Sequence, residues 1–286
     1  MERSTAGWGS GLLGVIIFSG SLPATRVAVA DFSPLFLTSA RAVIAALLGA
    51  TFLIALRQAR PERRDIFSLT LVAIGAVVGF PLLTALALQH INAAHSIVFI
   101  GLLPLATAIF GVLRGGERPK PAFWLFSIAG AAAVAGFALY GSSGGTLTGD
   151  LLMIAAILVC GLGYAEGATL SRHLGGWQVI SWALLLSLPI MAAIALFTLP
   201  HPWKSVGVPA WIGLAYVSIF SMMVGFIFWY RGLALGGIAG VGQLQLLQPF
   251  FGFVLAAIFL GEPIAWTMIA SAGIVVACVA GAKRLA

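Results

Sequence analysis

The sequence predicts an all-α integral membrane protein in which ten transmembrane helices form two inverted five-helix repeats, with both termini cytoplasmic. Three observations support this fold class. Hydrophobic residues make up 61% of the 286 residues and charged residues only 8%, with a mean hydropathy of +1.09. The apolar residues form continuous runs that are long enough to cross a bilayer as helices. One pattern of proline, glycine and glutamate occurs twice, once in each half of the chain.

The composition excludes a soluble globular protein, because such proteins carry about 25% charged residues. A net charge of +7 and a pI near 10.1 would otherwise suggest nucleic-acid binding. The basic residues lie in the short connections between apolar runs, as expected for cytoplasmic loops of a membrane protein. Cys160 and Cys278 both lie inside apolar runs and lack the spacing of a disulfide framework or a metal site. We expect both to be small buried hydrophobic side chains.

Ten apolar segments meet the length of about 20 residues that a helix needs to cross the hydrocarbon core. The strands of a membrane β-barrel would alternate apolar and polar residues, whereas these runs are continuous, so a helical bundle is predicted. The first run is longer than the core of a signal peptide, and we treat it as a retained helix. The ten segments are residues 10–30, 33–56, 66–89, 93–113, 122–140, 149–171, 178–199, 208–230, 238–260 and 264–282.

The distribution of lysine and arginine predicts the orientation. If the N-terminus is cytoplasmic, the outer loops carry only Lys204, while Arg26 and Arg41 fall within segments. This asymmetry follows the positive-inside rule, so both termini are predicted to be cytoplasmic. The inner loops and termini then carry Arg3, Arg57, Arg60, Arg63, Arg64, Arg114, Arg118, Lys120, Arg172, Arg231, Lys283 and Arg284.

The repeated pattern relates the two halves of the chain. Pro104 and Pro249 lie 145 positions apart, and so do Glu117 and Glu262, each glutamate being preceded by glycine. Each half contains five predicted spans, an odd number, so the second half must enter the membrane from the opposite side. Inverted repeats of this kind occur in secondary transporters, where the substrate site lies between the halves near the midplane.

The chain resembles the EamA family of the drug/metabolite transporter superfamily over essentially its whole length. It has two five-helix units, 1–145 and 146–286, each with a proline in its fourth helix and Gly-Glu at the end of that helix. The spacing from Pro34 to Arg41 in the second helix also matches the family pattern, although the second unit has Leu186 where the first has Arg41. In length and layout the chain is similar to the YddG-like exporters of aromatic and other amino acids. The resemblance implies transport by alternating access.

Gln245 and Gln248 are the first candidates for contacts with substrate. They lie three positions apart and therefore share one face of the ninth segment. Lipid offers an amide no partner, so both side chains should point inward. Pro249 removes the backbone donor that would bond the carbonyl group of Gln245, which predicts a further free polar group. The alternative is hydrogen bonding between helices, and Gln243 is predicted to point elsewhere.

Glu166 is the only carboxylate clearly inside a predicted span. A charge at the centre of a bilayer costs about 2.5–3.5 kcal/mol on insertion scales. The side chain should therefore contact a water-filled cavity or a partner, or stay protonated. It is a candidate for binding a substrate amine or for carrying a proton. The alternatives are a fixed ion pair and a position close enough to the cytoplasmic end to reach water.

Five further residues complete the candidate substrate site. Tyr164 and Trp182 are candidates to line a cavity, although most aromatic residues in membranes serve as interfacial anchors or in packing. His95 and Phe99 lie one turn apart at the start of the fourth segment, and an interfacial role near the outer surface is favoured for His95. Arg41 lies midway along the second segment. It is a candidate to bind a substrate carboxylate, but a structural pairing is favoured.

Pro104 and Pro249 are candidate hinges, because a proline inside a helix leaves a backbone carbonyl group unpaired. The sequence contains no GxxxxGK[ST], HExxH or GxSxG motif and no cluster with zinc spacing. We therefore expect no enzymatic activity, no cofactor, no metal, no nucleic acid and no ATPase subunit.

The predicted function is a secondary transporter that exports small polar metabolites across the cytoplasmic membrane, with aromatic or neutral amino acids as the expected substrates. Its expected partners are the small-molecule substrate and the lipid bilayer, and it is expected to be a monomer or a weak homodimer. Three alternatives remain at this point. The substrate is another metabolite, a drug or a nucleotide sugar within the same superfamily, or the protein is a passive channel, or it is an intramembrane enzyme.

Overall fold

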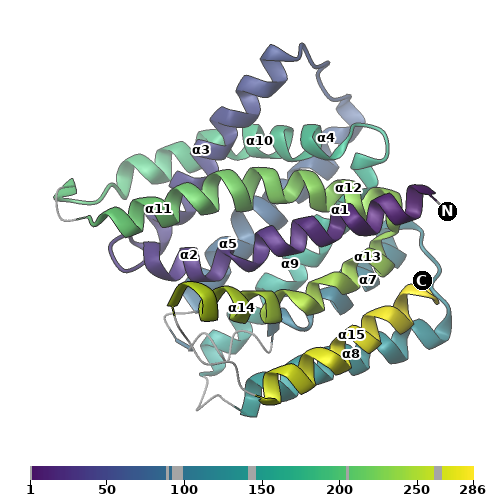
Figure 1. The fold of residues 1–286 in the computed structure, drawn as a ribbon. Coiled ribbons are helices and arrows are strands. Elements are labelled where there is room, and N and C mark those ends of the chain that lie inside the picture. The colour runs from purple at the N-terminus through teal and green to yellow at the C-terminus, as the bar shows by residue number, and fades with distance from the viewer. Residues whose placement is uncertain (1, 88–89, 92–98, 141–145, 204–205, 261–265) are drawn as a thin grey trace.

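The computed structural model describes residues 2–87, 90–91, 99–140, 146–203, 206–260 and 266–286, and within these ranges it is a helical bundle without strands (Figure 1). The predicted all-α class is therefore confirmed. The first-half helices are α1 (Glu2–Ser19), α2 (Ser21–Ala28), α3 (Pro34–Ala55), α4 (Arg63–Val72), η1 (Ala73–Gly79), α5 (Phe80–Ala87), α7 (Leu103–Gly115) and α8 (Pro121–Tyr140). The second-half helices are α9 (Leu147–Ser171), α10 (Gly176–Phe197), α11 (Val208–Tyr216), η3 (Val217–Gly225), α12 (Phe226–Gly236), α13 (Ile238–Gly242), η4 (Gln243–Leu247), α14 (Gln248–Leu260) and α15 (Trp266–Lys283).

Six helical stretches among the described residues are long and apolar enough to cross a membrane. Shorter apolar helices cover Leu103–Gly115, Pro121–Gly136 and Ala270–Lys283. The predicted count of ten spans therefore stays a prediction. The six long stretches are Thr5–Thr25, Pro34–Ala55, Arg63–Ala87, Leu147–Ser171, Gly176–Phe197 and Val208–Gly236.

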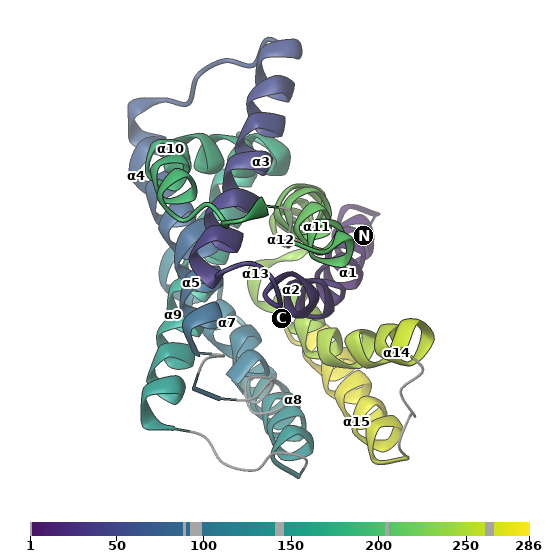
Figure 2. The same ribbon diagram turned by 90° about the vertical axis from the view of Figure 1, so that its left-hand side faces the viewer.

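The two halves of the chain interdigitate instead of forming separate lobes. The four most extensive helix contacts join α3 with α10, α1 with α12, α7 with α9, and α8 with α15. Each of these pairs takes one helix from either side of residue 145. The α3–α10 and α8–α15 pairs lie at opposite sides of the bundle (Figures 1 and 2). The largest buried cluster, which includes Trp229 and Tyr230, lies between these two outer pairs.

Both chain ends lie at one end of the bundle, on the right in Figure 1. We call this end, which carries Glu2 and Ala286, the termini end. The positive-inside rule predicts that it is cytoplasmic.

Three segments predicted as single helices change their winding along their length. The third predicted segment contains the π-helix η1, the eighth contains the π-helix η3, and the ninth is divided by the 3₁₀ turn η4. Adding the 145-residue offset to the bounds of η1 gives 218–224, which lies inside η3. The internal symmetry of the sequence therefore extends to the irregularities of the backbone, and π-helical turns are frequent at functional sites.

The two prolines proposed as hinges each stand in the first turn of an α-helical element. Pro104 is the second residue of α7 and Pro249 is the second residue of α14. Leu103 and Gln248, where these helices begin, are again 145 positions apart. Proline is well suited to a first helical turn, because its missing N–H has no partner to lose there. The expectation of a mid-helix proline is thus wrong for Pro104, whereas Pro249 lies within the unbroken helical stretch 238–260, where the winding changes from 3₁₀ to α. The role of both prolines as hinges stays a prediction.

We expect Gly79→Ala to lower the melting temperature of the purified protein by roughly 2–12 °C. A Cβ atom at Gly79 would lie 2.4 Å from the carbonyl oxygen of Ile74, five residues earlier in the same π-helix, and 3.1 Å from Val159 Cγ2. Gly273→Ala is the matched control, since a Cβ atom there meets nothing within 4 Å. Thermal unfolding in detergent gives the comparison, and equal melting temperatures for the two variants would show that η1 tolerates the extra carbon.

Candidate functional site

A group of polar side chains lies in the interior of the bundle, where α3, α9, α12 and η4 meet. Gln245 of η4 is only 2% exposed, and its Nε2 donates a hydrogen bond of 3.3 Å to the hydroxyl of Tyr164 on α9. Arg41 of α3 lies near Tyr164, and its Nε is buried. The indole of Trp229 on α12 packs edge-on against the Tyr164 ring at 5.5 Å. We call Arg41, Tyr164, Trp229 and Gln245 the central polar site.

The central polar site has hydrogen-bonding capacity that the protein itself does not use. Arg41 Nε, Trp229 Nε1 and Gln245 Oε1 are buried and have no hydrogen-bond partner within the described ranges. Buried polar atoms are nearly always paired, and an unpaired one calls for a specific explanation such as a water molecule or a ligand. Two donors and one acceptor are therefore available to a bound molecule, and one of the donors carries a positive charge.

An aromatic cluster adjoins the central polar site. Phe226, Trp229 and Tyr230 recur at the i, i+3 and i+4 positions of α12, so they share the face that meets α1 and α9. Phe226 lies 5.1 Å from Phe18 of α1 and 5.9 Å from Tyr164, measured between ring centroids. The cluster thus combines apolar surface from both halves of the chain. Such rings also offer negatively polarised faces to a cation.

Glu166 does not belong to the central polar site. Its carboxylate is 3% exposed and accepts a hydrogen bond from Nε of Arg114, which stands in the last turn of α7. Arg114 is 44% exposed along its side chain, so the pair reaches from the protein interior to the surface at the termini end. The arrangement corresponds to the ion pair that the sequence left open as an alternative to a functional role.

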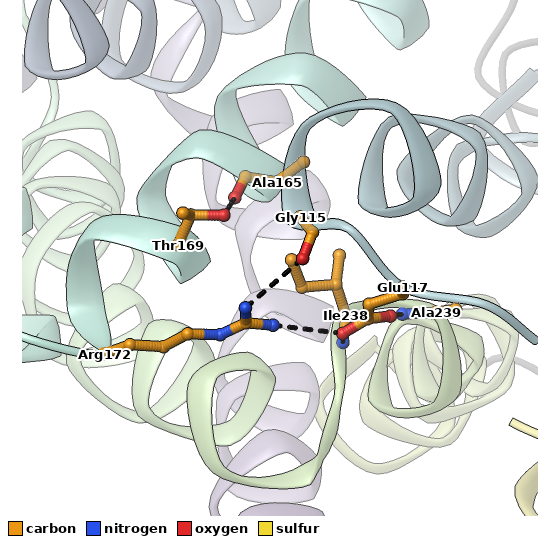
Figure 3. A network of polar contacts seen from close by, with 7 residues as sticks. All are labelled: Gly115, Glu117, Ala165, Thr169, Arg172, Ile238 and Ala239. Atoms are coloured by element: carbon orange, nitrogen blue, oxygen red, sulfur yellow. Dashed lines mark hydrogen bonds and ion pairs between the residues drawn. The ribbon is translucent and has the colours of Figure 1, made fainter.

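Glu117 forms the most connected polar contact at the termini end (Figure 3). Its carboxylate accepts hydrogen bonds from the backbone N–H groups of Ile238 at 2.6 Å and Ala239 at 2.7 Å, which open α13. Nη2 of Arg172, at the end of α9, lies 3.3 Å from the same carboxylate, and its Nη1 donates to the carbonyl oxygen of Gly115. A negative charge is stabilising at a helix start, because the first N–H groups there are unpaired.

Polar side-chain pairs join the two halves of the chain across the termini end. Each pair takes one residue from the first half and one from the second, and the contacts hold the ends of α3, α4 and α7 against α9 and α10. Separating the two halves at this end therefore requires these contacts to break. The pairs are Arg114 with Glu166, Glu117 with Arg172, Asp65 with His173 at 3.2 Å, and Gln58 with Gln178 at 3.3 Å.

Two cavities lie away from the central polar site. One, of about 290 Å³, opens at the termini end beside Glu117 and Arg118, where Nζ of Lys283 stands 4.7 Å above the Trp8 ring. The other, of about 280 Å³, is lined by apolar side chains of α7 and α9, including Leu105 and Ile157. Neither has residues of the central polar site in its lining.

The structure places the other predicted site residues in different surroundings. Gln248 is partly exposed and lies 3.5 Å from the carbonyl oxygen of Phe18, next to the aromatic cluster. Trp182 packs against the main hydrophobic cluster from α10. Phe99 lines the apolar cavity between α7 and α9, and His95 lies outside the described residues. Of the predicted residues, Gln245, Tyr164 and Arg41 are therefore the ones brought together.

The carbonyl group of Gln245 is not free, so that prediction is wrong. The backbone N–H of Gln248 donates to it, because the chain tightens to a 3₁₀ turn just before Pro249. Local 3₁₀ adjustment is a known way to pair a carbonyl group near a proline in a membrane.

Sequence reasoning did not include Trp229 or Phe226 in the predicted site. The signal available for them was the i, i+3, i+4 spacing of aromatic residues in the eighth segment. Glu117 was expected to mark only a helix end. The repeated Gly-Glu pattern indicated that it was structural, but the helix start that it caps lies 121 positions further along the chain.

Known proteins resemble the chain over nearly its full length. The sequence profile of the EamA-like transporter family matches residues 5–139 and again 147–282. The "Uncharacterized transporter YdeK" of Bacillus subtilis is 63% identical over 286 residues, which is 100% of both chains. The "Probable terminal-alkyne amino-acid exporter" of Streptantibioticus cattleyicolor is 23% identical over 269 residues, covering 92% of this chain and 88% of that protein.

A solved crystal structure of a protein with 20% sequence identity has the same fold. It superposes with a TM-score of 0.82 and covers 99% of this chain and 98% of the other. The resemblance drawn from the repeated proline and glutamate pattern is confirmed by the two matches to the family profile. With apolar helices throughout and a family match in each half, this chain is a membrane transporter that belongs to the EamA-like transporter family.

Proposed function

We propose that this transporter exports small amino acids, aromatic or neutral ones, across the cytoplasmic membrane by alternating access. The observation that supports this most is the set of unpaired polar atoms of Arg41, Trp229 and Gln245, buried next to aromatic rings. Inside a membrane protein, polar groups without a protein partner are expected where a ligand or water pairs with them.

The chemistry of the central polar site complements an amino-acid zwitterion. Arg41 and the indole N–H of Trp229 are donors for a carboxylate, and a hydrogen bond to a charged acceptor is stronger than a neutral one. Gln245 Oε1 is an acceptor for an ammonium group, which the nearby ring faces also attract. The rings of Phe18 and Phe226 supply apolar surface for a side chain, which favours aromatic and neutral amino acids over charged ones.

The printed name of one relative supports the same substrate class. The Streptantibioticus cattleyicolor protein, 23% identical, is named a probable exporter of a terminal-alkyne amino acid. Drugs and nucleotide sugars, the other substrates considered from the sequence, lack the pairing of a carboxylate and an ammonium group on one carbon. A buried, unpaired acceptor and a buried, unpaired charged donor suit the amino acid better.

Transport follows from the polar pairs at the termini end. In our proposal the bundle crosses the cytoplasmic membrane ten times with the termini end at the cytoplasm, so the structure represents a state closed toward the cytoplasm. Substrate enters when the contacts around Glu117 and Glu166 break, and the two inverted halves then exchange conformations. The cycle needs no ATPase subunit and no nucleic acid, and the transporting unit is a monomer or a weak homodimer.

Counterflow in proteoliposomes tests the proposed function. Vesicles loaded with one unlabelled amino acid at a time should take up the same radiolabelled amino acid transiently and with saturation, for at least one aromatic or neutral member of the set. Empty vesicles and vesicles with Arg41→Met protein are the controls. Uptake that rises linearly with concentration would indicate a passive channel. No counterflow with any amino acid, together with counterflow of a drug or nucleotide sugar, would contradict the substrate class.

A further inference from the structure

A second set of unpaired polar atoms lies beside η4, on a different face from Gln245. Gln243 is completely buried, and neither its Oε1 nor its Nε2 has a hydrogen-bond partner in the part of the chain that the structure describes. The same holds for Oγ1 of Thr107 on α7 and for Oγ of Ser127 on α8, which are 0% and 1% exposed. A Gln side chain with both amide atoms unpaired in a membrane bundle is unfavourable unless something else pairs with it.

The packing of α8 against the α13–η4 segment shows how far from the termini end these groups lie. Phe123 and Ala239 belong to one buried cluster near the termini end. Seven residues further along each chain segment, Gly130 lies against Leu246, whose Cδ1 would be 2.5 Å from a Cβ atom at Gly130. The two segments therefore run in parallel with matched register.

Gln243 and Ser127 stand between these two levels. Each precedes the Leu246–Gly130 contact by three residues, and side chains three apart in a 3₁₀ turn lie on the same side. Gln243 thus points toward α8, as Leu246 does, at the depth of Ser127. Thr107 lies beside the same turn on α7, because its Cγ2 would be 3.4 Å from a Cβ atom at Gly242. The three unpaired groups thus come from α7, α8 and η4, which contact one another.

The donors and acceptors of this set decide which ligand fits. All three side chains are neutral, the amide offers both donors and an acceptor, and each hydroxyl does both. A cation would leave the amide N–H₂ group unpaired, and an anion would leave the amide oxygen unpaired. A water molecule both donates and accepts, and buried water typically makes about three hydrogen bonds to otherwise unpaired groups.

We propose that α7, α8 and η4 enclose an internal water site, in which ordered water bridges Gln243 to Thr107 and Ser127. This site is separate from the central polar site, because the side chain of Gln245 points from the 3₁₀ turn toward Tyr164. The water ties α8, which packs mainly against α15, to the turn that carries Gln245. Gln243 is therefore a positioning residue: it holds η4 in the conformation that orients Gln245.

A high-resolution structure of the full-length protein in lipid nanodiscs tests the site directly. Density for water within about 2.7–3.2 Å of Gln243 Oε1 or Nε2, and of a hydroxyl of Thr107 or Ser127, is the expected result. A direct hydrogen bond from Gln243 to either hydroxyl, with no water density between them, would overturn the proposal.

A double-mutant cycle supplies a second test, with melting temperature as the readout. Ser127→Ala should lower the melting temperature by about 2–4 °C in the wild-type background. In a protein that already carries Gln243→Leu the same substitution should lower it by less than half as much, because the water bridge is already lost. Ser187→Ala is the control, since its hydroxyl bonds to Leu184 O in its own helix; it should give the same shift in both backgrounds. If Gln243→Leu does not fold, Thr107→Val replaces it. Additive shifts for Ser127→Ala would overturn the proposal.

Discussion

Arg41→Met should reduce amino-acid export at least about 30-fold, while the melting temperature of the purified protein stays unchanged or rises. Losing one partner of a buried, hydrogen-bonded charge pair costs about 2–5 kcal/mol, which is the loss expected for bound substrate. In the free protein, Arg41 Nε is buried without a partner among the described residues. Removing such a group relieves a desolvation cost, so stability and transport should change in opposite directions.

The melting temperature distinguishes this account from the structural role that the sequence favoured for Arg41. A structural arginine would lose stability and transport together when it is replaced. Arg41→Lys adds a graded control, because lysine keeps the charge but lacks the planar fork that pairs with a carboxylate. We expect an intermediate transport rate for it. Parallel losses of stability and transport in both variants would contradict the binding role.

Glu117→Ala should lower the melting temperature and open the termini end. Glu117 caps the start of α13 through two backbone N–H groups and pairs with Arg172. A helix cap contributes about 0.5–2 kcal/mol, and the half-exposed ion pair adds about 0.2–1 kcal/mol. We expect a cysteine placed at Ala168, which is fully buried, to react with a thiol reagent several-fold faster from the termini side in this variant.

Two further variants separate the helix cap that Glu117 forms from its ion pair with Arg172. Glu117→Gln keeps an acceptor for one N–H group and loses the charge, and Arg172→Gln loses only the ion pair. Labelling should therefore be fastest in Glu117→Ala, slower in Glu117→Gln and slowest in Arg172→Gln. In all of these proteins the native cysteines Cys160 and Cys278 are replaced by serine. Equal labelling in all three variants and in the unchanged protein would show that these contacts do not hold this end closed.

The repeat could be read from the sequence because proline and the Gly-Glu pair have local consequences. Proline is favoured in a first helical turn, and Pro104 and Pro249 both occupy one. A glutamate at a helix end was a sound structural interpretation for Glu117. The sequence did not show that the helix it caps is α13, because that contact spans the two halves and depends on how they pack.

The changes in winding could not be predicted from apolar periodicity. η1 and η3 lie in continuous apolar runs, where a π turn and an α turn have the same composition. Only packing reveals them, as where the missing side chain of Gly79 leaves room for the carbonyl oxygen of Ile74. The same limit applies to η4, where the 3₁₀ turn pairs the carbonyl group that the sequence left free.

Only some residues of the central polar site could be predicted, because contacts between helices cannot be seen in the sequence. Gln245, Tyr164 and Arg41 stood out because polar groups are rare in apolar runs. Glu166 stood out equally, but its partner Arg114 comes from another helix, and that pairing is invisible to a one-dimensional reading. Trp229 resembles many other membrane aromatics in the sequence, and only the structure shows that its ring packs against Tyr164 and that its Nε1 is buried and unpaired.

The central claim is that Arg41 binds the carboxylate of the substrate, and a binding cycle tests it most directly. The affinity of one transported amino acid and of its carboxamide is measured on the unchanged protein and on Arg41→Met. The account predicts at least a tenfold preference for the acid, about 1.4 kcal/mol, in the unchanged protein and none in the variant. The same preference in both proteins would place the carboxylate away from Arg41 and contradict the account.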